Sequence, residues 1–295
     1  MTKPRIALVI GIVCISIFPV LVRLSLTPGL ISAFYRMAFA SAVIVPYVLL
    51  AKKFVIPSRK LFLLSSLCGL IFGLDVGVWN IAIQGSSATQ ATLLTNLSPV
   101  WVGIGAFLFL KDKPLRNFWI GTVIALIGMV LLVGLRFFLK MEFNIPFFFA
   151  VLSGMLYAVY MLVSKFVLGE VDVVSFMTIS VMSSTITLGL ICVAIGEPFS
   201  GFSNEGWLVL VIQGLVCQLL AWLLISYATK HMRATRVSVS LLGQAILASI
   251  LAWIFLNESI TLQMIIGGLV LLLGIRITFY TKPLPLFRLS KKEKS

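Results

Sequence analysis

The chain has 295 residues, of which 60% are apolar and only 11% are charged, and its mean hydropathy is +1.14. In soluble domains about a quarter of the residues are charged, so this composition excludes a soluble globular protein and predicts an all-α integral membrane protein. The net charge of +14 would suggest nucleic acid in a soluble chain, so the positions of the basic residues have to decide its meaning.

Apolar stretches long enough to span a bilayer follow one another along the whole chain. A helix crosses a hydrocarbon core of roughly 30 Å with about 20 residues, whereas a barrel strand needs fewer. We predict ten transmembrane helices, at residues 6–26, 30–51, 61–83, 86–110, 117–138, 145–167, 173–195, 206–228, 234–256 and 261–281. The first is expected to be retained, because no small-residue cleavage site follows it. The linkers are too short for a nucleotide-binding domain, and no G-x-x-x-x-G-K-[ST] pattern occurs.

The basic residues fall almost entirely on one side of these spans. With the N-terminus inside, 18 of the 23 Lys and Arg are cytoplasmic, and only Arg136 and Lys140 are in outer loops. This split is a positive-inside signal that places both termini in the cytoplasm, including a basic tail at 282–295. The charge therefore indicates topology, and no nucleic-acid partner is expected.

The chain repeats itself at an offset of 146 residues. The run Ala88-Thr89 aligns with Ala234-Thr235, Phe109-Leu110-Lys111-Asp112 with Phe255-Leu256-Asn257-Glu258, Gly121 with Gly267, and Gly128 with Gly274. Each half holds five spans, and because five is odd the second half enters the bilayer from the opposite side. We predict two inverted five-helix repeats, 1–146 and 147–281, an architecture typical of secondary transporters.

Asp75 is the one acid well inside a predicted span, and Arg23 and Arg36 lie within the first and second spans. Each costs roughly 2.5–3.5 kcal/mol to insert, so each needs a partner or a role. Arg23, Arg36 and Asp75 all fall in the outer half of the membrane, and we predict that Asp75 pairs with Arg36 or Arg23. Two alternatives stay open: Arg23 snorkels to the surface, and an Arg36–Asp75 pair only fixes helix packing instead of serving the substrate or gating.

Polar and aromatic residues form stripes on five further helix faces. Helices 3, 4, 6, 8 and 9 carry the predicted substrate-binding residues Trp79, Asn96, Tyr157, Tyr160, Gln213 and Gln244, and all of them except Trp79 lie near the middle of their spans. The plainer interpretation of each stripe is hydrogen bonding between helices. Together they favour a central polar and aromatic cavity, where amides and phenols orient a polar solute and rings cover its apolar part. We expect this site to be uncharged.

No metal, cofactor or catalytic pattern accompanies these residues. Cys14, Cys68, Cys192 and Cys217 lie in apolar spans without CxxC spacing, and His231 lies in a basic loop. No HExxH or GxSxG motif and no paired intramembrane acids occur, so we expect neither an enzyme nor a cofactor.

Three segments resemble the drug/metabolite transporter superfamily, EamA-like branch. They are Ala33-Phe34-Tyr35-Arg36-Met37-Ala38-Phe39-Ala40, the run from Ser87-Ala88 through Leu97-Ser98-Pro99 to Leu110-Lys111-Asp112, and its echo from Ala234 to Leu256-Asn257-Glu258. The resemblance covers nearly the whole chain and implies a multi-pass carrier of the bacterial inner membrane, with a central cavity, that usually moves amino acids, metabolites or xenobiotics outward. One departure is Ala245 where the first half has Pro99, so we expect the halves to bend unequally.

A secondary transporter is therefore favoured over a membrane enzyme and over a non-transporting sensor or scaffold, which the short loops do not support. We expect export of an amphipathic amino acid or related metabolite, with uptake or exchange of a larger metabolite as the alternative. The expected partners are the small-molecule substrate and the lipid bilayer, and a homodimer is left open. Facilitated diffusion is the simpler default, and any proton coupling would run through Asp75.

Overall fold

The computed structural model describes residues 2–24, 26–85, 94–111, 113–134, 144–257 and 259–281, and every regular element in these ranges is a helix. The helices are α1 (Lys3–Arg23), α2 (Gly29–Leu50), α3 (Arg59–Gly85), α5 (Ser98–Phe109), α6 (Arg116–Val133), α8 (Ile145–Glu170), α9 (Val173–Ile195), α10 (Asn204–Ile212), the π-helix η1 (Gln213–Leu220), α11 (Ala221–His231), α12 (Ala234–Leu241), α13 (Gln244–Leu256) and α14 (Leu262–Thr278).

These helices match the predicted spans closely. In the described part of the chain, eight helices are long and apolar enough to cross a membrane, counting Asn204–His231 and Ala234–Leu256 as one helix each. Ser98–Phe109 and Leu262–Thr278 are shorter apolar helices. Residues 86–93 of the fourth predicted span lie outside the described residues, as do Arg136, Lys140 and the tail 282–295.

Polar side chains start the helices of the second half. Asn144 caps α8, Asp172 caps α9, Ser203 caps α10 and Thr261 caps α14, each accepting a hydrogen bond from a backbone N–H of the first turn. The caps satisfy donors that a helix end leaves open. Gly196 ends α9 in a left-handed conformation with φ 81°, which a residue without a side chain adopts at no steric cost.

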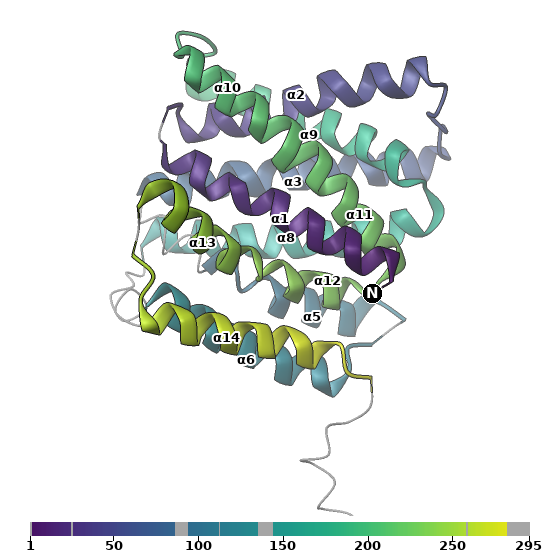
Figure 1. The fold of residues 1–295 in the computed structure, drawn as a ribbon. Coiled ribbons are helices and arrows are strands. Elements are labelled where there is room, and N and C mark those ends of the chain that lie inside the picture. Colours follow the sequence, from purple (N-terminus) through teal and green to yellow (C-terminus); the bar gives the residue numbers. More distant parts are fainter. Residues whose placement is uncertain are drawn as a thin grey trace, which may run out of the picture.

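The first and last described helices, α1 and α14, begin and end at the same end of the bundle. Figure 1 shows the start of α1 and the end of α14 on one side, and the Arg5 guanidinium lies 5.2 Å from the ring centre of Phe279. We call this side the terminal end. The opposite end carries the α1–α2 turn at 24–28 and the α9–α10 loop at 196–203.

Helices at equivalent places in the two halves pack antiparallel. α6 and α14 lie together at one edge of the bundle (Figure 1), where Gly121 faces Gly274 and Gly128 faces Gly267. In the internal repeat Gly121 corresponds to Gly267 and Gly128 corresponds to Gly274. Each glycine of α6 therefore faces the glycine that corresponds to the other one. Any Cβ at Gly121 would lie 2.6 Å from the Gly274 oxygen, so this close approach requires glycine.

In the other helix contacts too, a pair of helices from the two halves is matched by the pair of their equivalents. α3 packs on α8 and α9, and its equivalent, formed by α10, η1 and α11, packs on α1 and α2. α5 packs on α8, and its equivalent α13 packs on α1. α2 and its equivalent α9 also contact each other, with Ser41 Oγ 2.9 Å from Thr185 Oγ1. The main contacts thus join one half to the other, as inverted repeats require.

Two spans are broken at equivalent positions. The fourth breaks at Asn96 and Leu97, where the Leu97 N–H donates to the Leu94 carbonyl at 3.1 Å. The ninth breaks 146 residues later, where the Gly243 N–H donates to the Ser240 carbonyl at 3.0 Å.

Both spans therefore break at corresponding positions, although proline follows the break in only one of them, with Pro99 in the fourth span and Ala245 in the ninth. Glycine at 243 weakens the helix at that point. The Ser240 hydroxyl also donates to the Arg236 carbonyl four residues earlier, at 2.7 Å, an arrangement that favours helix bending.

Candidate functional site

The two buried charges lie at the centre of the bundle on neighbouring helices. Arg36 of α2 is 5% exposed and Asp75 of α3 is 6% exposed. Asp75 Oδ1 accepts a hydrogen bond from Ser153 Oγ of α8 at 2.5 Å. The Arg36 guanidinium lies over the Phe18 ring of α1, 4.6 Å from its centre, which is within the range of a cation–π interaction.

The predicted ion pair is not formed among the described side chains. No N–O distance of 4.0 Å or less joins Asp75 to Arg36, although the two charges are near enough to interact electrostatically. Each charge has a local partner instead, a hydroxyl for the acid and an aromatic face for the base. The Arg23 side chain, the other predicted partner, lies outside the described residues.

Four aromatic rings pack together on the terminal-end side of Asp75. Phe72 of α3 lies 4.8 Å from Tyr160 and 4.7 Å from Trp222 between ring centres, and Tyr157 lies 6.3 Å from both Tyr160 and Trp222. Most of these contacts are tilted or edge-on, as aromatic pairs prefer. We call Phe72, Tyr157, Tyr160 and Trp222 the aromatic cluster.

Several buried polar atoms around this centre have no hydrogen-bond partner within the described structure. They include Arg36 Nε, Tyr157 Oη, Gln218 Oε1 and Trp222 Nε1, which come from α2, α8, η1 and α11. An unsatisfied buried donor or acceptor costs about 1–3 kcal/mol, so proteins rarely keep several in one region without a ligand or water to satisfy them. The arrangement has the capacity to hydrogen-bond a polar solute.

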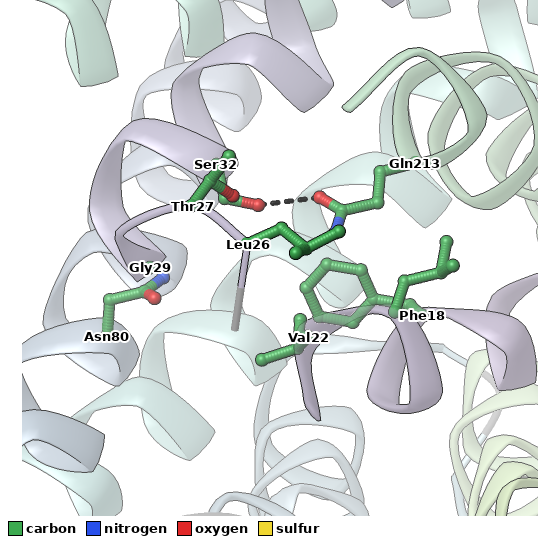
Figure 2. A pocket seen from close by; sticks show the side chains of 9 residues that line it. Phe18, Val22, Leu26, Thr27, Gly29, Ser32, Asn80 and Gln213 are labelled. Atoms are coloured by element: carbon green, nitrogen blue, oxygen red, sulfur yellow. Dashed lines mark hydrogen bonds between the residues drawn. The ribbon is translucent and has the colours of Figure 1, made fainter. Parts of the chain in front are cut away.

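A small cavity adjoins this region (Figure 2). It has a volume of about 20 Å³, enough for a water molecule. Phe18, Ser32 and Gln213 are among its lining residues, and Ser32 Oγ donates to Gln213 Oε1 at 2.6 Å across the boundary between the halves. Asn80 and Gly29 line its far wall beside the α1–α2 turn.

The comparisons with known proteins decide the family. The sequence profile of the EamA-like transporter family matches the chain twice, at residues 3–134 and at residues 144–280. The chain belongs to this family. The predicted all-α membrane fold and the predicted resemblance are thereby confirmed, and the protein is a membrane transporter; the count of ten spans stays a prediction.

Named relatives agree with this family. An uncharacterized transporter of Archaeoglobus fulgidus is 25% identical over 83% of this chain and 86% of its own length. The uncharacterized transporter YdfC of Bacillus subtilis is 25% identical over 68% of this chain, and the match spans 65% of that protein's length. An S-adenosylmethionine uptake transporter of Rickettsia felis is 27% identical over 47% of this chain and 46% of its own. One crystal structure superposes with a TM-score of 0.80 at 14% identity, over 94% of this chain and 96% of the other, a likeness of fold alone.

Most residues predicted for the site of this EamA-like transporter come together. Tyr157 and Tyr160 form half of the aromatic cluster, Gln213 lines the cavity, and Trp79 lies 6.2 Å from Phe18 between ring centres. The other two predicted residues lie at the helix breaks. Asn96 is buried in the break of the fourth span, and Gln244 is half-buried directly after the break of the ninth.

Two features of the site escaped the sequence. Phe18 and Ser32 lie in apolar spans, and an aromatic ring or a serine there resembles many that face lipid or neighbouring helices. The π-helix Gln213–Leu220 has no sequence signal of its own, although such segments often occur at functional sites. It buries both Gln213 and Gln218, each 1% exposed.

Glycine lets the π-helix come close to α2. A Cβ added at Gly214 would lie 2.6 Å from the Phe39 Cβ and 3.2 Å from the Arg36 carbonyl oxygen. This contact holds η1 of the second half against the helix that carries Arg36. The polar groups of the two halves therefore meet across one interface.

Proposed function

We propose that the protein is a secondary transporter whose two halves, 1–146 and 147–281, rock about the central site to expose it alternately to either side. The observation that carries this proposal is the set of partnerless buried polar atoms on α2, α8, η1 and α11. They come from both halves and surround the middle of the bundle. A solute bound there would satisfy them and be released when the halves separate on one side.

The broken spans support a rocking mechanism. Breaks at 96–97 and 242–243 are equivalent by the internal repeat, so each half has a helix break at the corresponding place. Discontinuous helices near the midplane are the usual site of solute contact in inverted-repeat carriers. We therefore keep Asn96 and Gln244 with Trp79, Tyr157, Tyr160 and Gln213 as proposed solute contacts, and Asp75 as the group that would carry a proton if transport is coupled.

For the substrate we propose a small amphipathic metabolite, such as an amino acid with an apolar side chain. The aromatic cluster offers apolar surface, and the polar groups beside it offer hydrogen bonds. We propose export across the bacterial inner membrane, with both termini cytoplasmic, on the basis of the family resemblance and of the basic residues gathered on one side. Transport without catalysis is proposed, since no catalytic motif occurs in the sequence.

Uptake is the second candidate. It is favoured by the similarity to proteins named as S-adenosylmethionine uptake transporters, which covers slightly under half of this chain. S-adenosylmethionine carries a sulfonium cation, which is attracted to the face of an aromatic ring, and an adenine ring, which can stack on one. The aromatic cluster supports a substrate of this kind as well.

Solute flux in vesicles tests the proposal. The purified protein is reconstituted into liposomes, and a panel of labelled amino acids and S-adenosylmethionine is followed across the membrane in both directions. We expect saturable flux of at least one solute above that of protein-free vesicles. Flux equal to that of empty vesicles for the whole panel would contradict the proposed substrate class.

A further inference from the structure

We propose that Arg36 and Asp75 make the central site selective for an amino-acid zwitterion, so that the site is charged and not uncharged as expected from the sequence. The Arg36 guanidinium would bind the carboxylate, the Asp75 carboxylate would bind the ammonium group, and the aromatic cluster would hold an apolar side chain. This inference rests on the transport function proposed for the same site, and it names the groups that define its substrate class.

Arg36 has the properties of an anion receptor. The side chain is 95% removed from solvent, its Nε has no partner among the described residues, and no described carboxylate lies within 4.0 Å of it. A guanidinium stays charged, and a charge buried in a membrane protein is costly without a counter-ion. The planar fork of arginine fits a carboxylate through two parallel hydrogen bonds.

A second donor lies beside Arg36. Ser32, one turn earlier on α2, donates to the amide oxygen of Gln213 at 2.6 Å, so Gln213 has its NH₂ group to offer to a solute. Phe18 lies beside both Arg36 and Gln213. Its ring lines the cavity together with Ser32 and Gln213, and the Arg36 guanidinium lies over the same ring. Figure 2 shows Ser32, Gln213 and Phe18 around the same cavity.

Asp75 supplies the opposite charge. It accepts a hydrogen bond from Ser153, and a carboxylate can accept several more. It lies on α3, which contacts the α2 helix of Arg36, and no N–O distance of 4.0 Å or less joins the two groups. One cation and one anion held apart in a buried site complement a solute that carries both charges, and they penalise a solute that carries only one.

The aromatic cluster adjoins the charged groups along two helices. On α3, Phe72 precedes Asp75 by three residues, and on α8, Tyr157 follows Ser153 by four, so both aromatic residues lie one helical turn nearer the terminal end. An amino acid with its charged groups at Arg36 and Asp75 would therefore direct its side chain into the cluster. Buried rings favour an apolar or aromatic side chain there.

Binding of three matched solutes tests the assignment. Leucine, its amide and 4-methylpentanoate differ in the carboxylate and ammonium groups, and phenylalanine with its two corresponding analogues forms a second series. Calorimetric titration of the purified wild type should show each amino acid binding at least about 10-fold tighter than either analogue, as expected for charge-assisted hydrogen bonds. In Arg36→Gln the preference over the amide should fall to about twofold or less, while the preference over the deaminated acid persists.

Asp75→Asn should lose the other preference: it should no longer distinguish the amino acid from the deaminated acid, while the preference over the amide persists. Arg59→Gln, at an exposed site at the terminal end, is the control and should keep both ratios. Arg36→Lys keeps the charge without the fork and should retain part of the preference over the amide. A general loss of stability would weaken all three solutes alike and would leave the ratios unchanged.

The zwitterion assignment is overturned if Arg36→Gln keeps the wild-type preference, or if the wild type binds the amides as tightly as the amino acids or binds neither series. In any of these cases, saturable flux of another solute in vesicles would leave the transport function standing. Absence of flux for every solute of the vesicle panel would instead defeat the transport proposal itself.

Discussion

Replacing Tyr157 by phenylalanine should stabilise the solute-free protein and weaken solute binding at the same time. The Tyr157 hydroxyl is buried and has no hydrogen-bond partner in the described structure. Its removal relieves a desolvation cost of about 1–3 kcal/mol and leaves the ring contacts with Tyr160 and Trp222 in place. We expect a gain of about 1 kcal/mol in the free energy of unfolding, or a Tm about 2–4 °C higher.

Solute binding should respond in the opposite direction, because the same hydroxyl is proposed to hydrogen-bond the substrate. The loss of one neutral hydrogen bond corresponds to about 1 kcal/mol, or a roughly fivefold weaker Kd. Thermal unfolding, followed by intrinsic fluorescence with and without solute at one scan rate, measures both effects. Tyr280→Phe, at a site that is 43% exposed, is the control and should change neither.

A lower Tm for Tyr157→Phe in the absence of solute would refute this reasoning, because it would mean that the hydroxyl already has a stabilising partner. An unchanged affinity would separately remove Tyr157 from the solute contacts. Either result would require a different account of the partnerless polar atoms in the bundle.

Three further predictions concern coupling, packing and topology. Asp75→Asn should abolish any effect of an imposed pH gradient on flux in vesicles, and gradient-driven flux that persists would show that Asp75 is not the proton carrier. Gly128→Val should cost about 1–3 kcal/mol by overpacking against Leu271, seen as a lower Tm, and a wild-type Tm would contradict the close contact of α6 and α14. In whole cells, impermeant thiol reagents should label Glu197→Cys but not His231→Cys, and the reverse pattern would invert the topology.

The spans and their repeat could be predicted from sequence because the bilayer imposes them. About 20 apolar residues are needed for each crossing, and a glycine ridge such as Gly121 and Gly128 is needed where equivalent helices meet. Polar residues such as Gln213 and Tyr157 stand out in so apolar a chain, so most of the proposed site was also visible. The constraints that the bilayer imposes thus make both the spans and the polar positions recognisable in the sequence.

Features that depend on the packing between halves could not be predicted. The break at Leu242 and Gly243 was missed because it was judged from the absence of proline at Ala245, whereas glycine and a back-bonded serine weaken the helix there. The predicted contact of Asp75 with Arg36 assumed that opposite buried charges must touch. Ser153 and Phe18 instead hold them separately, and no sequence spacing reveals partners on other helices.

Cross-linking of the two halves tests the account most directly. The rings of Phe34 and Phe199 contact each other across the halves, 5.4 Å apart between centres, and neither residue is a proposed solute contact. In a variant with the native cysteines replaced and Phe34→Cys and Phe199→Cys introduced, a short reducible bis-methanethiosulfonate should stop solute flux in vesicles, and reduction should restore it. Full cross-linking with undiminished flux would contradict transport by rocking of the halves about this site.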